Sequence, residues 1–168
     1  NALDILNYTK ADFIKIETDK KNIKIVKHLT NHKIKVVTHI GVTPQKFINF
    51  NKIKSVGSDT KSSNNLIKLA TQLEKAGSKF IVLECIDLST SKKITDTLSI
   101  PTIGIGASKF CDGQVLVIDD ILNFYSIGKK PKFVKNYINI EKFIIKAVSK
   151  FVKEVKNKKF PLSEHTYK

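Results

Sequence analysis

Five short runs rich in β-branched residues recur along the chain, and helical patterns separate them. Most of the runs are nearly continuous apolar stretches, which is typical of strands covered on both faces. Strand and helix alternate at intervals of about 22 residues, the rhythm of parallel βα units. The sequence therefore predicts an α/β fold, either a doubly wound sheet or a (β/α)8 barrel. The five predicted strands are Phe13–Glu17, Lys35–Ile40, Phe80–Cys85, Thr102–Gly106 and Val115–Asp119.

Four segments between and after these runs have apolar residues at helical spacing. A short helix is predicted around Val26. The next helix has Ser62 or Ser63 as its N-cap and stops at Gly77, a residue suited to the position after a helix end. Ser89 is predicted to cap the following helix, which Pro101 limits. The strongest pattern covers the last helix, with apolar side chains at Ile140, Phe143, Ile144, Ala147, Val148, Phe151, Val152 and Val155.

The length of 168 residues is enough for one domain with a substantial core, so we expect a single domain over residues 1–168. The longest interval between strands contains the polar stretch Thr43–Ser63. This stretch is expected to be either an active-site loop over the strand ends or a loosely structured insertion.

The net charge of +15 raises the question of nucleic-acid binding, because basic side chains neutralise phosphates. All 30 basic residues are lysine, whereas arginine is better shaped for bidentate contacts to guanine or phosphate. The lysines are also spread over the whole chain together with many Ile, Asn and Phe, the residues that AT-rich codons favour. We therefore expect a solvated basic surface and no nucleic-acid partner.

Two further features bear on location. Cys85 and Cys111 lack metal-ligand spacing and are expected to be small buried apolar residues. No stretch of about 18 apolar residues occurs, so no membrane partner is expected. Since nothing resembles a secretion signal or indicates an oxidising compartment, we expect a cytoplasmic protein.

Side chains able to do chemistry stand at or near the ends of three predicted strands. Glu17 closes the first, His39 the second and Glu84 the third, and Lys15 lies on the same face as Glu17. In a parallel sheet the carboxyl ends of the strands meet at one edge. Two carboxylates, a histidine and a lysine there could supply a metal ligand, a base and a cation for an anionic substrate.

Each of these residues also has a purely structural interpretation. Glu17 could be an exposed acid at the start of a loop, and His39 a core histidine bonded to backbone. Lys15 could form a salt bridge with Glu17. Glu84 lies within an apolar run, where a carboxylate needs a partner or a function. The residues alone therefore predict a metal-assisted or acid/base site without identifying its substrate.

Several motifs, read in order, resemble the ketopantoate hydroxymethyltransferase family. Thr38–Gln45 (T-H-I-G-V-T-P-Q) is similar to the family's G-H-[IL]-G-L-T-P-Q, and Phe13–Glu17 and Ile81–Cys85 are similar to its V-K-[IL]-E and [LV]-V-L-E-C strands. The resemblance continues through the segments Ile100–Ala107 (I-P-T-I-G-I-G-A), Asp112–Val117 (D-G-Q-V-L-V), Pro131–Tyr137 (P-K-F-V-K-N-Y), Phe160–Pro161 and Glu164–His165.

This resemblance implies a (β/α)8 TIM barrel of the phosphoenolpyruvate/pyruvate-binding superfamily, in which the chain would form strands four to eight and the C-terminal helices. It implies transfer of a hydroxymethyl group from 5,10-methylenetetrahydrofolate to 3-methyl-2-oxobutanoate, through an enolate stabilised by Mg²⁺. Glu84 would be the proton acceptor and Glu17 would belong to the magnesium site. Lys15 and His39 would bind substrate. A homodecamer is the assembly that the family implies.

Some positions depart from the family pattern. Thr18 and Asp19 replace glycines, Ser108 replaces the last glycine of G-I-G-A-G, and Lys54–Ser58 lacks an arginine. The early strands of the family, with two aspartates and a serine, are expected to lie N-terminal to Asn1. Two alternatives therefore stay open: a truncated, non-catalytic remnant of the barrel, and a related carbon–carbon lyase of the isocitrate lyase superfamily. The K-K-C-G-H-type loop usual in those lyases is absent.

Overall fold

The computed structural model describes residues 1–43, 55–124 and 130–167. Its central feature is a parallel sheet of five strands in the order β1-β2-β3-β4-β5, so each strand lies beside the one that precedes it in the chain. The strands are β1 (Ile14–Glu17), β2 (Val36–Gly41), β3 (Phe80–Glu84), β4 (Thr102–Ile105) and β5 (Gly113–Gln114).

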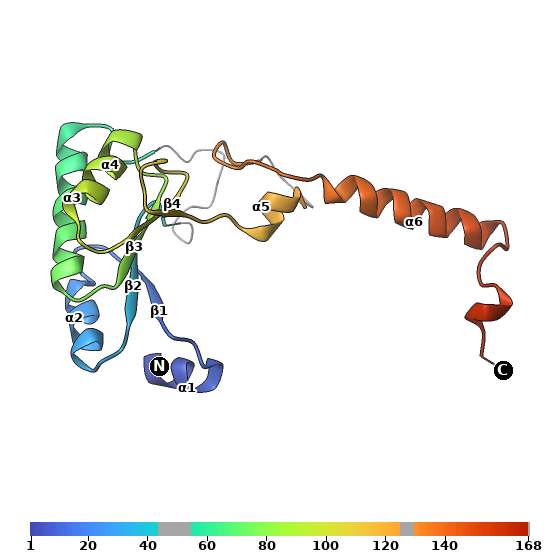
Figure 1. Cartoon of the computed structure of the whole chain (residues 1–168), viewed down its shortest axis with the longest axis horizontal. Helices are drawn as coiled ribbons and strands as arrows, with labels where there is room; N and C mark the ends of the chain where they lie inside the picture. The colour runs from blue at the N-terminus through green and yellow to red at the C-terminus, as the bar shows by residue number, and fades with distance from the viewer. Residues whose placement is uncertain (44–54, 125–129, 168) are drawn as a thin grey trace. The chain divides into compact units, whose positions relative to one another are not determined.

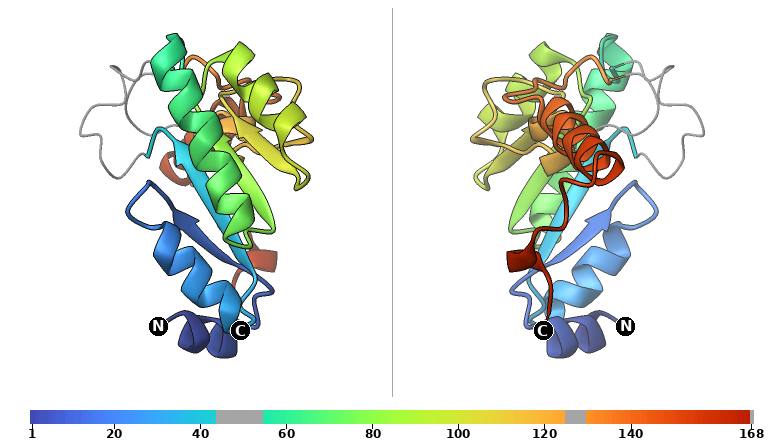
Figure 2. Two further views of the ribbon diagram at one scale, coloured as in Figure 1. Left: turned by 90° about the vertical axis from the view of Figure 1, so that its left-hand side faces the viewer. Right: turned by 90° about the vertical axis from the view of Figure 1, so that its right-hand side faces the viewer.

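Three helices follow the first three strands: α2 (Ile23–Asn31) follows β1, α3 (Thr60–Lys75) follows β2 and α4 (Leu88–Thr97) follows β3. All three lie on the same face of the sheet (Figures 1 and 2). A doubly wound sheet has helices on both faces and a reversal of strand order, and this sheet has neither. The arrangement is that of an α/β fold with a parallel sheet, consistent with part of a barrel. The remaining helices are α1 (Ala2–Thr9), α5 (Ile118–Leu122), α6 (Ile140–Lys156) and the 3₁₀ turn η3 (Ser163–His165).

The core lies between the sheet and these helices. Leu69 and Leu73 of α3 pack in one cluster with Ile40 of β2 and with Ile81 and Leu83 of β3. The strand residues of this cluster alternate with those that point to the opposite face. Each fully buried aliphatic side chain contributes about 1.5–3 kcal/mol to folding. The helix-covered face of the sheet is thus the apolar one, which leaves the other face for chemistry.

Several predicted helices are confirmed, but two predicted caps are wrong. α2 and α6 cover the predicted segments, and Gly77 follows the C-cap of α3 with φ of +96°. The N-cap of α3 is Asp59, whose carboxylate accepts from the backbone N–H of Ser62. Ser62 and Ser63 therefore lie inside the helix. The Asp59 side chain precedes them and already accepts from a backbone N–H group at the start of the helix, which is the role predicted for a serine.

The N-cap predicted for α4 is also wrong. Asp87 is the N-cap, and its carboxylate accepts from the backbone N–H groups of Ser89 and Thr90, so Ser89 is the second residue of the helix. An ionised carboxylate is a stronger acceptor for these groups than a serine hydroxyl. Both corrections move the helix start towards the amino terminus.

The predicted strand Val115–Asp119 is wrong. Pairing with β4 covers only Gly113 and Gln114 of β5, and α5 begins at Ile118. β5 is the last strand in the order of the sheet, where a strand has a partner on one side only. Two acids, Asp119 and Asp120, occupy the first turn of α5, a position that favours negative charge.

The chain divides into two compact units, residues 1–115 with 131–133 and residues 116–130 with 134–168. The first contains the sheet with α1 to α4, and the second contains α5 and α6. The expectation of one domain over residues 1–168 stays a prediction. None of the helices in the described ranges combines the length and the apolar character needed to cross a bilayer.

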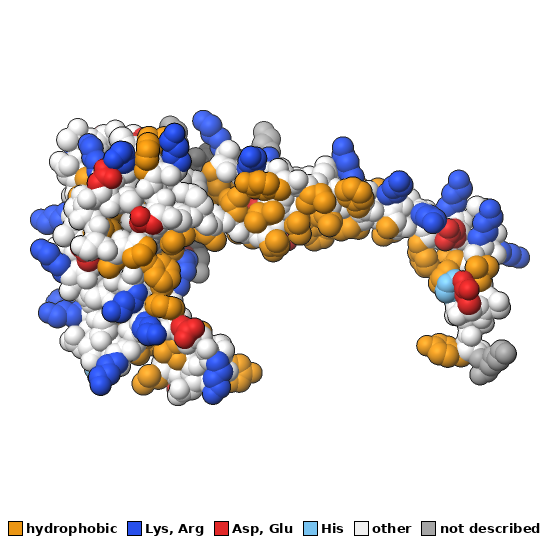
Figure 3. All heavy atoms as spheres, in the orientation of Figure 1, with side chains coloured by type: hydrophobic (Ala, Val, Ile, Leu, Met, Phe, Trp, Pro, Cys, Tyr) orange, Lys and Arg blue, Asp and Glu red, His pale blue; other side chains and the backbone are white. Residues whose placement is uncertain are grey.

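Helix α6 has an apolar side without any buried residue. Figure 3 shows the apolar side chains gathered along it. Its lysines and glutamates occupy other positions around the helix, so the amphipathic pattern that predicted the helix is intact. The exposed apolar residues of α6 are Phe143, Ile144, Ile145, Val148, Phe151, Val152 and Val155.

Candidate active site

The candidate site lies on the face of the sheet that α2, α3 and α4 leave uncovered. The register pairs Glu17 with His39 across β1 and β2, and Gly41 with Glu84 across β2 and β3. Since side chains alternate along each strand, Lys15, Glu17, His39 and Glu84 all belong to this one face. The sequence-based prediction that they share a face near the carboxyl ends of the strands is confirmed.

His39 is at the centre of this group and is only 1% exposed. The Lys15 ammonium nitrogen lies 3.4 Å from its Nδ1, and a carboxylate oxygen of Glu84 lies 3.0 Å from its Nε2. We call these three side chains the Lys15–His39–Glu84 row. A lysine ammonium can only donate, so Nδ1 of the ring is the acceptor and a neutral ring has its proton on Nε2. That N–H then faces the negative charge of Glu84.

The contact between His39 and Glu84 is electrostatic rather than an aligned hydrogen bond. Although the two atoms are 3.0 Å apart, Nε2 of His39 has no hydrogen-bond partner of good geometry among the described residues.

Glu84 is held in place by the ends of β2 and β3. Its backbone carbonyl accepts from the N–H of Val42 at 2.9 Å. At Gly41 the chain has φ of +109°, and a Cβ there would lie 2.1 Å from the same carbonyl oxygen. Only glycine allows this close approach. Gly41 therefore brings the end of β2 against Glu84.

Glu17 lies beside His39, but its carboxylate has a different environment. Its backbone carbonyl accepts from the side-chain amide of Asn22 at 3.0 Å, which fixes the end of β1. Its carboxylate forms no hydrogen bond or ion pair within the described ranges, and no Lys15–Glu17 salt bridge exists. Among the described residues, the Glu17 carboxylate is therefore an oxygen ligand at the strand ends that no other group engages.

Whether the site could hold a magnesium ion depends on which side chains offer oxygen ligands at the strand ends. Within the described ranges, no group of three or more His, Cys, Asp or Glu side chains could enclose a metal ion. Mg²⁺ in proteins is often held by one or two carboxylates together with water and substrate oxygens. The carboxylate of Glu17 fits one such ligand.

Thr18 follows Glu17 where the family pattern has glycine. It is buried, and both its N–H and its hydroxyl donate to the carbonyl of His39, at 2.8 and 2.9 Å. This substitution therefore connects the end of β1 to His39. Sequence reasoning treated Thr18 only as a departure, and no pattern along the chain revealed the bonding.

Cys85 follows Glu84 and is buried, as predicted for both cysteines, neither of which forms a disulfide. Burial and, to a lesser degree, the nearby charge of Glu84 raise the pKa of the Cys85 thiol from its ordinary value of 9.0 to about 11. The thiol therefore stays protonated at neutral pH and is a poor nucleophile there.

The sequence is similar to that of one family of known proteins. The family model described as ketopantoate hydroxymethyltransferase matches residues 1–163. Over 167 residues, 99% of the chain, it is 47% identical to the 3-methyl-2-oxobutanoate hydroxymethyltransferase of Pelagibacter ubique (strain HTCC1062), covering 63% of that protein.

Two further relatives have the same name. The protein of Clostridium botulinum (strain 657 / Type Ba4) is 44% identical over all of this chain and 61% of its own length. That of Bacillus cereus (strain B4264) is 39% identical over 99% of this chain and 60% of its own length. The chain thus spans about three fifths of the length of these curated relatives. The chain belongs to the ketopantoate hydroxymethyltransferase family.

Proposed function

We propose that the protein transfers a hydroxymethyl group from 5,10-methylenetetrahydrofolate to 3-methyl-2-oxobutanoate, giving 2-dehydropantoate. The fold that goes with this proposal is a (β/α)8 barrel of the phosphoenolpyruvate/pyruvate-binding superfamily, in which β1 to β5 are strands four to eight. A homodecameric assembly and a cytoplasmic location belong to the same proposal. Family membership supports all of these points.

The observation that carries the proposed chemistry is the Lys15–His39–Glu84 row. It places a carboxylate, an imidazole and an ammonium group on one face of three neighbouring parallel strands. Removal of a proton next to a carbonyl needs a positioned base, and the resulting negative charge needs nearby cations. The row contains both.

In the proposed reaction Glu84 accepts the proton from C3 of the oxoacid, and the electrons of that C–H bond move into the enolate. His39 holds the Glu84 carboxylate through its Nε2–H, and Lys15 pairs with the negative charge of the substrate. The enolate carbon then forms a bond with the methylene carbon of the folate as the first of the two carbon–nitrogen bonds of that methylene breaks. Water displaces the second nitrogen and leaves its hydroxyl group on the product. The two freed nitrogens take up the proton held by Glu84 and the remaining proton of the water, and tetrahydrofolate leaves.

We propose that Glu17 supplies one oxygen ligand to a magnesium ion at the same edge of the sheet. When bound, the ion supplies a Lewis acid for the oxoacid carbonyl. The support for this role is the carboxylate of Glu17, which lies beside His39 without a partner in the part of the chain that the structure describes. Further oxygen ligands would come from water and from the substrate.

The first half-reaction gives the sharpest test, because it needs no folate. The protein, purified as its gene encodes it, is incubated in D₂O with Mg²⁺ and 3-methyl-2-oxobutanoate, and proton NMR follows the loss of the C3 proton. We expect exchange well above the rate without protein. Glu84→Gln should reduce it by about 10²–10⁴-fold, the usual contribution of a general base.

Glu141→Gln, at an exposed position on α6, is the matched control and should exchange like the unaltered protein. Equal exchange by the Glu84→Gln variant would overturn the assignment of the base. Absence of exchange in every variant would favour the non-catalytic alternative. A related carbon–carbon lyase would exchange the proton but would not form 2-dehydropantoate when the folate is added.

A further inference from the structure

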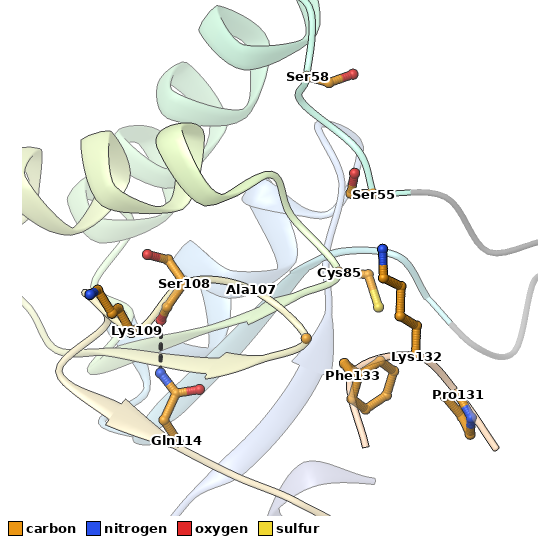
Figure 4. A pocket seen from close by; sticks show the side chains of 11 residues that line it. Ser55, Ser58, Cys85, Ala107, Ser108, Lys109, Gln114, Pro131, Lys132 and Phe133 are labelled. Atoms are coloured by element: carbon orange, nitrogen blue, oxygen red, sulfur yellow. Dashed lines mark hydrogen bonds between the residues drawn. The ribbon is translucent and has the colours of Figure 1, made fainter. Parts of the chain in front are cut away.

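Two histidines lie at the end of the sheet opposite the proposed base. The cavity whose lining side chains Figure 4 shows includes Cys85, the neighbour of Glu84, so it lies at the carboxyl ends of the strands. His28 in the last turn of α2 and His32 at its C-cap instead precede β2, so they lie near the amino ends. Both side chains are exposed. The proposed reaction uses neither of them.

The two imidazole rings lie against each other because of their spacing along the helix. Residues four apart share one face of an α-helix, one turn above the other. The ring centroids of His28 and His32 are 4.5 Å apart, with an angle of 44° between the ring planes. A metal ion held by one nitrogen of each ring, at about 2.1 Å and with the two bonds at right angles, puts the ring centres about 4.6 Å apart. The rings therefore already have the separation that a shared ion requires.

The ring of His32 is oriented by the backbone of His28. Its Nδ1 lies 2.8 Å from the carbonyl oxygen of His28. A carbonyl can only accept, so Nδ1 carries the proton and Nε2 of the neutral ring presents a lone pair. Histidines that bind metals commonly donate their other ring N–H to a backbone carbonyl, which fixes both the tautomer and the direction of the ligand. This hydrogen bond favours a metal ligand independently of the spacing of the pair.

The helix end that carries the pair is fixed to the rest of the fold. Val26, in the middle of α2, is fully buried in the core. The hydroxyl of Thr30 donates to the carbonyl of Ala76, the C-cap of α3, at 2.6 Å. The N–H of Ile34 donates to the carbonyl of Leu29 at 3.1 Å, which holds the chain after the helix. Ligands on such a fixed element lose little conformational entropy when they bind an ion.

The charges around the pair both favour and oppose a cation. The carboxyl end of a helix carries partial negative charge from its free carbonyl groups. Lys24 lies one turn before His28 on the same face, and Lys27 and Lys33 directly precede one histidine and follow the other. These ammonium groups repel a metal ion, so salt, which screens them, should strengthen binding. Within the described ranges no third histidine, cysteine or carboxylate joins the pair.

We propose that His28 and His32 form a binding site for a divalent transition metal ion, with Ni²⁺ or Cu²⁺ as the best fit. Imidazole suits these ions, and their square-planar or tetragonal coordination places neighbouring ligands at right angles. The ion accepts a lone pair from one nitrogen of each neutral ring, and water completes its coordination. The second imidazole binds from the same helix and so adds affinity. Bound metal then holds the last turn of α2 and stabilises the folded chain.

The test is isothermal titration calorimetry with Ni²⁺, on the whole chain purified without a histidine tag. Excess Mg²⁺ is present to fill carboxylate sites, because it prefers oxygen ligands. We expect one Ni²⁺ per chain, bound more tightly at high than at low salt. His28→Gln and His32→Gln should each weaken binding by at least about tenfold, because either change leaves a single imidazole. His165→Gln removes an exposed histidine of η3 and should bind like the unaltered chain.

An exchange of two neighbouring residues gives a matched control of unchanged composition. Lys27→His combined with His28→Lys places the histidines five residues apart, on different sides of the helix, and should bind as weakly as His28→Gln. Circular dichroism checks that each variant is folded. It also follows thermal unfolding, in which Ni²⁺ should raise the Tm of the unaltered chain and of His165→Gln but not of His28→Gln.

Three results would overturn the inference. The first is failure of the unaltered chain to bind Ni²⁺. The second is equal loss of affinity in His28→Gln and His165→Gln, and the third is binding by the exchanged variant as tight as that of the unaltered chain.

Discussion

Nε2 of His39 lies 3.0 Å from a carboxylate oxygen of Glu84, across two neighbouring parallel strands. Lys15 contacts the other nitrogen of the same ring. A buried imidazole between an ammonium and a carboxylate is oriented on both sides, and it orients both partners in return. His39 was predicted to bind substrate, and this stays a prediction. Its burial indicates that it also positions Glu84.

Two substitutions of His39 separate positioning from substrate binding. His39→Ala leaves the Glu84 carboxylate without its neighbour, and we expect kcat to fall about tenfold, which corresponds to about 1.4 kcal/mol. His39→Gln retains an N–H that can face Glu84, so kcat should recover in part. Steady-state kinetics provide the measurement. A raised KM with unchanged kcat in both variants would instead assign His39 to substrate binding.

Cys85 predicts a loss of stability in alkaline solution. Because the folded state raises the pKa of this thiol from 9.0 to about 11, its contribution to stability is complete below pH 9 and is lost as pH rises through the folded pKa. Chemical denaturation between pH 8 and pH 11 should therefore show a steeper decline for the unaltered chain than for Cys85→Ala. Parallel declines in both proteins would show that burial of the thiol does not resist its ionisation.

Asp87 predicts a loss of stability in acid solution, whereas Cys85 predicts a loss in alkaline solution. Hydrogen bonds from the Ser89 side chain and from backbone N–H groups at the start of α4 lower its pKa below the ordinary 3.8. Its stabilising effect is present above pH 3.8 and is lost as pH falls through the lowered pKa. At neutral pH Asp87→Ala should cost about 1 kcal/mol of unfolding free energy.

Asp87→Asn is the matched variant, because an amide oxygen also caps a helix but does not titrate in this range. It should lose little stability at pH 7, and the difference between Asp87→Ala and the unaltered chain should shrink as the solution is acidified. Urea unfolding at several pH values measures both effects. A pH-independent cost of Asp87→Ala would contradict the proposed role of the ionised carboxylate.

The apolar side of α6 predicts self-association. Phe143 is 63% exposed and Val148 is 55% exposed, and contiguous apolar surface of this kind favours contact between molecules. Replacing both residues with glutamine, which retains helix propensity, should lower the sedimentation-average mass at a given concentration. Lys146→Gln on the same helix is the control and should behave like the unaltered chain. Equal association of all three proteins would exclude α6 as its cause.

Sequence patterns predicted the elements well where local and tertiary preferences agree. The continuous apolar runs of β2 and β3 became buried strands, and the helical spacing from Ile140 to Val155 became α6. The four candidate side chains were placed on one face because alternation along parallel strands is a strict geometric rule. The stretch Thr43–Ser63 was predicted to be an active-site loop or a loosely structured insertion, and its residues 44–54 lie outside the described residues. The prediction is wrong for Thr60–Ser63, which form the first turn of α3.

The predictions were wrong where residues distant in the sequence determine the structure, or where a nearby side chain is a stronger hydrogen-bond acceptor than the one predicted. Val115–Asp119 has the composition of a strand, but the part of the chain that pairs with β4 on this side is limited to Gly113 and Gln114 of β5. The serines predicted as N-caps lie inside their helices, because Asp59 and Asp87 precede them and accept from the backbone N–H groups at the helix starts. The packing of Phe133 on Gly106 could not be read from the sequence, although the G-I-G pattern is a signal of close approach.

The row of Lys15, His39 and Glu84 comes from three consecutive strands, each paired with the next over its length. A single continuous stretch of about 70 residues therefore encodes the whole arrangement. Circular permutation, gene fission or fusion outside residues 14–84 would leave these side chains on one module. Changes elsewhere in the gene would therefore not separate Lys15, His39 and Glu84 from one another.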